Sequence, residues 1–211
     1  MAMNRRNFFV HVLPAKINRR SMSFSYNFMW MGVIAFWLFV ILLLTGIFLM
    51  FYYVPSVERA YASIKEIMET VSFGRWMRNM HKWSGEVMVI AVFLHMLRVF
   101  YTGAYQRPRE FNWAIGVMLF LITIFFAFSG YILPWDQLGY YAAKIASKIA
   151  EGTPFIGDKV KYAMLGGHEL AQPSLLRWYV IHVFLLPALF IFIISIHFWR
   201  IRKDEFSIPP K

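Results

Sequence analysis

Residues 81–95 read HKWSGEVMVIAVFLH, a mostly apolar run with a histidine at each end. Over fourteen residues an α-helix turns through about 1400°, which is about 40° short of four full turns. His81 and His95 are therefore expected on one face of a helix, about 21 Å apart along its axis. A histidine inside a membrane helix is costly and marks a functional site, although any one of them can instead hydrogen-bond to a neighbouring helix.

This run belongs to one of four apolar stretches that are long enough to cross a bilayer, which takes about 20 helical residues. The expected spans are residues 29–54, 80–105, 113–135 and 178–201. The composition agrees, because 59% of the 211 residues are hydrophobic and only 16% are charged. The sequence therefore predicts an all-α membrane protein with one domain, residues 1–211, built as a four-helix bundle.

The basic residues are divided unevenly between the two sides of the predicted bundle. Four spans place both termini on one side, which carries 12 basic and 3 acidic residues, against 10 and 8 on the other side. The positive-inside rule places the more basic side, with both termini, in the cytoplasm of a bacterial or archaeal cell. The formal net charge of +11 thus indicates a lipid membrane as partner and no nucleic acid.

The connections on the opposite, outer side have a helical pattern of their own. Apolar residues recur every three or four positions in residues 57–71 and again in residues 137–150. This spacing predicts amphipathic helices that lie on the membrane surface. Residues 151–173 are rich in glycine, proline and charge, and are expected to form a loop with one short helix near residues 158–165.

The fourth span carries a second pair of histidines, His182 and His197, which are fifteen residues apart. This spacing overshoots four turns by about 60°, and the intervening Pro187 could restore the alignment through a kink or a local change of winding. Two antiparallel helices would then pair His81 with His182 and His95 with His197 at two depths. Each pair could hold one planar macrocycle between two imidazoles, which indicates two haems.

Four glycines repeat the same spacing on the other two spans. Gly32 and Gly46 are fourteen residues apart, as are Gly116 and Gly130. A single glycine in a membrane helix usually reflects close helix packing, but two pairs with this spacing indicate room made for a macrocycle. By depth, Gly46 and Gly130 belong to the outer histidine level, and Gly32 and Gly116 to the inner one.

Haem propionates are anionic and should meet cations near the span ends. Arg78 and Lys82 flank the outer level, and Arg98 follows the inner one by a turn. The alternative is that these are ordinary cations extended toward the membrane surface. His11 and His168 lie in expected loops and are interpreted as solvated or structural.

The chain contains no cysteine, so it offers no disulfide, thiolate, iron–sulfur ligand or thioether attachment for a haem. Two histidines per iron leave no open coordination position, which favours electron transfer over oxygen binding. A transporter or structural bundle without a cofactor stays open as an alternative. It predicts a colourless protein and does not explain the repeated spacings.

These spacings, with Gly-Tyr-Ile-Leu-Pro-Trp-Asp-Gln at 130–137 and Phe-Tyr-Tyr-Val-Pro at 51–55, resemble the cytochrome b6 family over nearly the whole chain. That family comprises the four-helix cytochrome b subunits of b6f and related bc-type quinol oxidoreductases. The resemblance implies two non-covalent haems b, a low-potential one at the outer histidine pair and a high-potential one at the inner pair. It also implies quinol and quinone as substrates.

The resemblance implies two quinone sites. Pro134, Trp135, Asp136 and Gln137 match one wall of an outer quinol-oxidation site, and Arg202 matches a basic residue at an inner quinone site. Met31 stands where cytochrome b6 has a cysteine that attaches a third haem, so no covalent haem is expected through this chain.

The family's Pro-Glu-Trp-Tyr motif, which supplies a quinol-site carboxylate, is absent and usually resides in a separate small subunit. The implied function is an electron-transfer subunit of a Q-cycle complex, not active alone. The implied partners are that subunit IV-like protein, a Rieske iron–sulfur protein, a c-type cytochrome, or both, and a second copy of the complex. The alternative is a dihaem b membrane anchor of a dehydrogenase or hydrogenase, without bifurcation of electrons.

Overall fold

The structure is a computed structural model that describes residues 30–204, and within that range its regular elements are all helical. Its long apolar helices confirm the predicted four-span, all-α fold. They are α3 (Met31–Met50), α5 (Gly74–Tyr101), α6 (Glu110–Ile132) and the continuous helical run Gln172–Asp204. His11, the first residue of the first expected span and the remainder of both terminal segments lie outside the described residues.

The fourth span consists of three consecutive elements, α9 (Gln172–Val180), η2 (Ile181–Leu185) and α10 (Leu186–Asp204). The middle element is a π-helical turn, in which the Leu186 N–H donates to the carbonyl of Ile181, five residues earlier. Pro187 follows directly and has no N–H to continue the regular ladder. A π turn accommodates one extra residue, so a spacing of fifteen here covers nearly the rotation of fourteen in an α-helix. The anticipated change of winding is therefore present.

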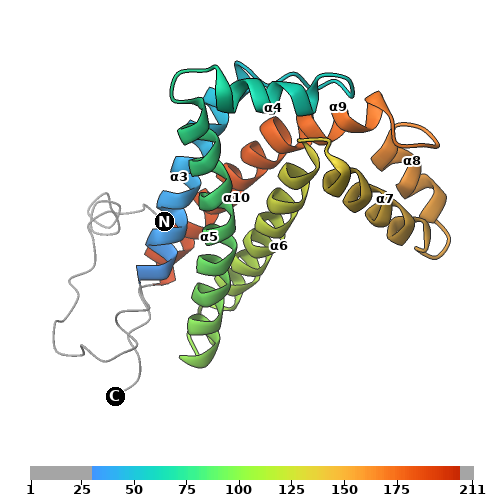
Figure 1. Ribbon diagram of the computed structural model, residues 1–211. Helices are drawn as coiled ribbons and strands as arrows, with labels where there is room; N and C mark the ends of the chain where they lie inside the picture. The colour runs from blue at the N-terminus through green and yellow to red at the C-terminus, as the bar shows by residue number, and fades with distance from the viewer. Residues whose placement is uncertain (1–29, 205–211) are drawn as a thin grey trace, which may run out of the picture.

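Three shorter helices lie at the outer end of the bundle: α4 (Ala60–Glu69), α7 (Gln137–Glu151) and α8 (Gly157–Leu165). In Figure 1, α4 lies across the end of the bundle, while α7 and α8 form a hairpin that projects to one side. They confirm the expected amphipathic surface helices. The apolar faces of α4 and α7 bury small or aliphatic residues, including Ile67 and Ala143.

Two spans begin earlier than their hydropathy indicates. The second begins at Gly74 rather than near residue 80, because Arg75 and Arg78 occupy its first turns. Arginine propagates a helix well although it lowers the local hydropathy. The fourth begins at Gln172 rather than near residue 178, and Pro173 stands in its first turn, where proline fits a helix. Both helices therefore extend beyond the apolar part of the span.

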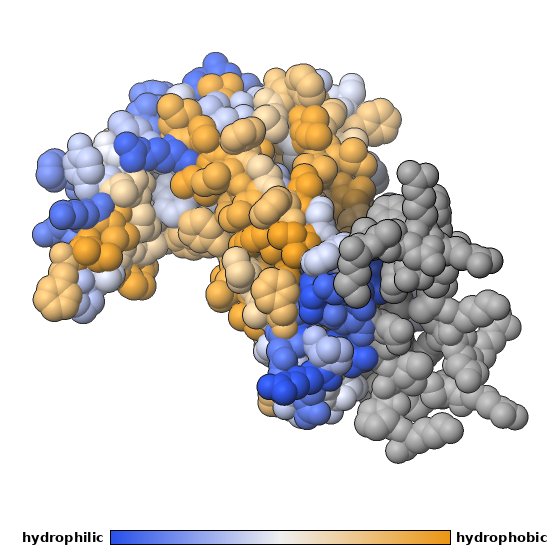
Figure 2. Space-filling model, turned by 180° about the vertical axis from the view of Figure 1, so that it is seen from behind, coloured by the Kyte–Doolittle hydropathy of each residue, from blue (hydrophilic) through white to orange (hydrophobic). Residues whose placement is uncertain are grey.

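One apolar cluster receives side chains from all four spans and fills the middle of the bundle. Its buried members are Phe39, Met88, Ile115, Leu119, Phe190 and Ile193. Met88 stands midway between the two histidines of α5, and Phe190 lies between those of the fourth span. The interior is thus divided into an outer level, a dry central layer and an inner level. Figure 2 shows the matching apolar band on the outside, with hydrophilic surface beyond it.

The outer loops are fixed by hydrogen bonds between segments far apart in sequence. The Tyr53 hydroxyl donates to the Leu133 carbonyl over 2.6 Å. The Gln172 side chain accepts from the Val57 N–H at 2.9 Å and donates to the Pro55 carbonyl at 2.8 Å. The segment after α3 therefore joins the end of α6 to the start of α9.

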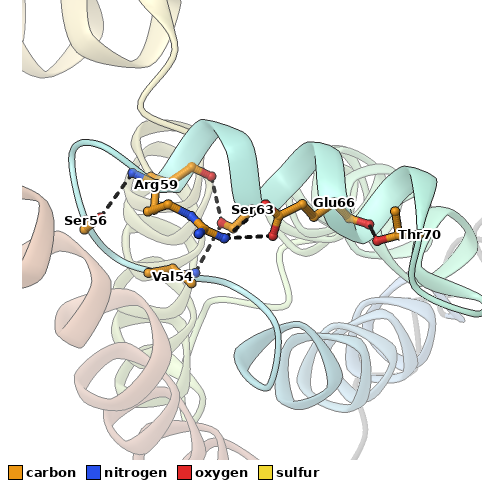
Figure 3. A network of polar contacts seen from close by, with 7 residues as sticks. Val54, Ser56, Arg59, Ser63, Glu66 and Thr70 are labelled. Carbon is orange, nitrogen blue, oxygen red and sulfur yellow. Dashed lines mark hydrogen bonds and ion pairs between the residues drawn. The ribbon is translucent and has the colours of Figure 1, made fainter.

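Polar contacts within α4 and the loop before it hold that helix in place (Figure 3). Arg59 Nη2 donates to both carboxylate oxygens of Glu66 at 3.0 Å. The buried Ser63 hydroxyl accepts from the Val54 N–H at 3.2 Å and donates to the Ala60 carbonyl at 2.8 Å. The loop and the helix thus form one unit above the outer histidine level.

Candidate functional site

At the outer level, His81 of α5 and His182 of η2 face each other across the bundle. Their ring centroids are 6.2 Å apart and the planes are inclined by 73°. Both rings lie against a glycine of a neighbouring span. A Cβ added at Gly46 would come within 3.2 Å of His81 Cε1, and one at Gly130 within 2.7 Å of His182 Cε1. A side chain at Gly130 would therefore clash with the His182 ring, and one at Gly46 would require the His81 ring to shift by a few tenths of an ångström.

Two buried hydroxyls hold these rings. Thr45 Oγ1 lies 2.9 Å from Nδ1 of His81, and Ser129 Oγ lies 2.9 Å from Nδ1 of His182. With Nδ1 engaged, Nε2 is the nitrogen of each ring that is left for a ligand bond. The sequence reasoning missed both residues. The available signal was a hydroxyl residue directly before each outer-level glycine.

At the inner level, His95 of α5 lies against α3 and His197 of α10 lies against α6. A Cβ at Gly32 would come within 3.0 Å of His95 Cε1, whereas one at Gly116 would be 3.8 Å from His197 Cε1. Nδ1 of His95 is buried and has no hydrogen-bond partner in the described part of the chain, whereas the His197 ring interacts with the backbone of Asn112. The structure therefore brings each of the four glycines to the histidine of its own level.

The outer ring pair fits a metal ion bound between two imidazoles. Metal–imidazole bonds are about 2.0–2.1 Å for zinc, so two such bonds and two ring radii together span about 6 Å. Among the described residues, no group of three or more His, Cys, Asp or Glu side chains could hold an ion by itself. A group that brings its own ligands would complete such a site. A haem, with four equatorial nitrogens and room provided by the glycines, fits this donor set.

The three candidate cations differ in their surroundings. Arg98 has Nε and Nη2 buried without a hydrogen-bond partner in the described chain, which fits an anion that the protein itself does not supply. Arg78 is half-buried, one turn before His81 on α5. Lys82 is exposed, pairs with Glu86 at 3.6 Å and lies over the Trp83 ring.

Residues 133–136 form the tight turn between α6 and α7, and Gln137 is the first residue of α7. Trp135 has a left-handed backbone with φ +50°, and its ring lies 5.8 Å from that of Tyr140. The Asp136 carboxylate accepts from the Gly139 N–H at 2.8 Å and so caps α7. Pro134 is half-buried and Gln137 is exposed. Asp136 thus has a structural role that sequence reasoning did not assign.

Three further expected positions are also described. Arg202 is exposed near the end of α10, and Met31 is the half-buried first residue of α3, next to Gly32. His168 lies in the loop after α8, with its ring 5.5 Å from that of Tyr162. None of these three described residues makes a hydrogen bond to His81 or His182.

Comparisons with known proteins agree with this arrangement. The cytochrome b/b6/petB family model matches residues 16–205. Cytochrome b6 of Heliomicrobium gestii is 44% identical over 182 residues, covering 86% of this chain and 85% of that protein. The menaquinol:cytochrome c reductase cytochrome b subunit of Bacillus subtilis is 40% identical over 203 residues, covering 94% and 89%.

A solved structure of a hyperthermophilic respiratory complex III contains a chain with the same fold. The TM-score is 0.82 at 29% sequence identity, over 97% of this chain. The match covers 54% of the other chain, so the present protein spans about half its length.

Proposed function

The chain belongs to the cytochrome b/b6 family and is a cytochrome b subunit of the b6f/bc type, and we propose that it conducts electrons across the membrane between an outer quinol-oxidation site and an inner quinone site. In this proposal, His81 and His182 hold one non-covalent haem b, and His95 and His197 hold a second. The observation that carries it is the outer ring pair, 6.2 Å apart, with Nδ1 of both rings engaged by hydroxyls.

A haem held by two of these imidazoles would supply reversible one-electron transfer. The chain's own residues do the rest. The four glycines leave space for the macrocycles, and Arg98 at the inner level supplies the buried cation that a propionate needs. Arg78 is assigned the same role at the outer level. Lys82, which pairs with Glu86, is a weaker candidate than its position in the sequence indicates.

The layer between the two levels excludes water and carries closely packed aromatic rings. The Phe126 ring lies 5.7 Å from that of His182 and 6.0 Å from that of Phe190. Phe190 in turn lies 4.4 Å from Phe39. The two histidine levels are separated by about 21 Å of helix. Two haems at these levels would divide electron transfer across a hydrocarbon core of about 30 Å into shorter steps. The central layer keeps the two levels apart and dry.

The turn at Pro134, Trp135 and Asp136, together with Gln137 at the start of α7, forms one wall of the proposed outer quinol site. Arg202 contributes to the inner quinone site. A separate small subunit completes the outer site. A Rieske protein, a c-type cytochrome or both accept the second electron in a Q-cycle, within a homodimeric complex. Both termini lie on the cytoplasmic side of a bacterial or archaeal membrane, as the excess of basic residues on that side supports.

The alternative proposal is a dihaem anchor that passes electrons between a peripheral dehydrogenase or hydrogenase and quinone. Purification of the complex through a tag on this chain distinguishes the Q-cycle subunit from the dihaem anchor. Quinol oxidation that reduces a c-type cytochrome, together with the electron paramagnetic resonance signal of a Rieske cluster, supports the Q-cycle complex. A copurifying flavoprotein or nickel hydrogenase, without a Rieske cluster, supports the anchor.

A further inference from the structure

The two hydroxyls at the outer level occupy equivalent positions. Thr45 directly precedes Gly46 on α3, and Ser129 directly precedes Gly130 on α6. Both are buried, with exposed fractions of 5% and 0%. Each glycine admits a ring, and the hydroxyl before it reaches Nδ1 of the same ring.

The direction of these hydrogen bonds follows from the single hydrogen of a hydroxyl. Thr45 donates that hydrogen to the Ile41 carbonyl at 2.7 Å, and Ser129 donates its own to the Phe126 carbonyl at 3.0 Å. Each hydroxyl oxygen then accepts from the imidazole, so Nδ1–H is the donor. This tautomer leaves the Nε2 lone pair free for a metal.

The inner level lacks this arrangement. Met31 and Ile115 precede the inner glycines, and neither has a polar side chain. Nδ1 of His95 is buried without a hydrogen-bond partner in the described chain, and the His197 ring interacts with the backbone of Asn112 rather than with a hydroxyl. The two levels therefore differ in the atoms that surround the rings, although their glycine and histidine spacings are alike.

We propose that Thr45 and Ser129 are positioning residues that fix the tautomer of His81 and His182 and thereby lower the reduction potential of the outer haem. A hydrogen bond accepted from Nδ1–H makes the imidazole a more basic ligand, which stabilises the more positive oxidised iron. The proposal rests on the proposed haem binding and extends it to residues that do not touch the haem iron.

The test is a potentiometric titration of the complex, purified with either Thr45→Val or Ser129→Ala, followed by optical absorbance of the b haems. Each variant removes one acceptor and is expected to raise the midpoint potential of the outer haem only. The electron paramagnetic resonance signal of the same oxidised haem should move as well, because the ligand field of one histidine has changed. The double variant should show the larger shift.

Two controls separate this effect from a loss of structure. Thr45→Ser keeps the hydroxyl and should retain the wild-type potential. Thr123 is 2% exposed and donates to the Leu119 carbonyl at 2.8 Å, but has no histidine partner among the described residues. Thr123→Val therefore removes a comparable buried hydroxyl and should leave both potentials unchanged.

Unchanged potentials in Thr45→Val and Ser129→Ala, with both haems bound, would overturn the inference while leaving the proposed function intact. Equal shifts of both haems, or the same shift in Thr123→Val, would overturn it too. If Thr45→Val loses the outer haem, Ser129→Ala, which removes a single oxygen atom, provides the comparison. A wild-type complex without two b haems would instead contradict the proposed function.

Discussion

The hydroxyl of Tyr53 donates to the carbonyl of Leu133 over 2.6 Å and thereby joins the loop after α3 to the turn after α6. Tyr53 is 9% exposed, and its ring lies 5.6 Å from that of Tyr179. Burial, followed by the neighbouring Tyr179, raises the pKa of Tyr53 well above its usual value. The hydroxyl therefore remains a donor throughout the working pH range, and the turn at residues 133–136 is held in place.

Tyr53→Phe is expected to destabilise the outer loops, because it leaves the buried Leu133 carbonyl without its donor. An unsatisfied buried group of this kind costs about 1–3 kcal/mol. The thermal midpoint, followed by tryptophan fluorescence in detergent, should fall. Tyr52→Phe is the matched control, since Tyr52 is 44% exposed and makes no hydroxyl hydrogen bond among the described residues. An equal effect of both substitutions would contradict this role for Tyr53.

Gly130 and Gly116 make a matched pair on α6. A methyl group at Gly130 would lie 2.7 Å from His182 Cε1, whereas one at Gly116 would lie 3.8 Å from His197 Cε1, which is ordinary van der Waals contact. Gly130→Ala should therefore displace the outer ring and abolish or strongly reduce outer haem binding. Gly116→Ala should retain both haems. The measurement is the haem content per chain, determined by absorbance. Retention of both haems in Gly130→Ala would contradict the packing argument.

Arg98 has buried nitrogens without a partner in the described chain, whereas Lys82 is exposed and paired with Glu86. We expect Arg98→Gln to lower occupancy of the inner haem or to change its midpoint potential, because a buried cation opposite a propionate is lost. Lys82→Gln should leave the outer haem unchanged. Redox titration of the two variants measures the midpoint potentials of both haems in each. A shift in Lys82→Gln and none in Arg98→Gln would reverse the assignment.

The α7–α8 hairpin contains an ion-pair cluster whose effect depends on pH. Glu151 Oε2 lies 3.0 Å from the ammonium groups of both Lys148 and Lys161. Hydrogen bonds from Lys161 and then Lys148 lower the pKa of Glu151. A lowered folded-state pKa means that the stabilisation is present above the unfolded pKa of about 4.5 and is lost as the pH falls through the folded value.

Glu151→Gln should accordingly increase hydrogen exchange in α8 at pH 7 and have no effect at a pH below the folded pKa. The comparison is made by mass spectrometry, with exchange rates corrected for their intrinsic pH dependence. Glu58→Gln, outside the hairpin, serves as the control. A difference between Glu151→Gln and wild type that persists unchanged in acid would contradict the ion-pair explanation.

Much of the fold could be predicted from periodic patterns, because helical geometry fixes which residues share a face. The number of spans follows from the lengths of the apolar runs, and the surface helices and the level of each glycine follow from spacings. The long-range contacts could not be predicted in this way. Tyr53 meets Leu133, and Gln172 meets Pro55, across long sequence separations that no local pattern encodes.

The hydroxyls at the outer level were missed for a different reason. A threonine or serine within a helix commonly bonds to a carbonyl of its own helix, and Thr45 and Ser129 do so. Only the structure shows that each also accepts from a histidine ring of another element. Asp136 was interpreted only as part of a quinol-site wall, although aspartate directly before a helix is a common N-cap. In that case the sequence contained a local signal that was not used.

The central claim is that the paired histidines hold two haems b, and a haem count tests it most directly. The complex is purified through this chain, and pyridine haemochrome spectra, which distinguish b from c haems, are combined with a redox titration. The account predicts two non-covalent b haems per chain with separate midpoint potentials. It further predicts that His81→Ala and His95→Ala each lose a different one. A count of one or none in the wild-type complex would contradict it.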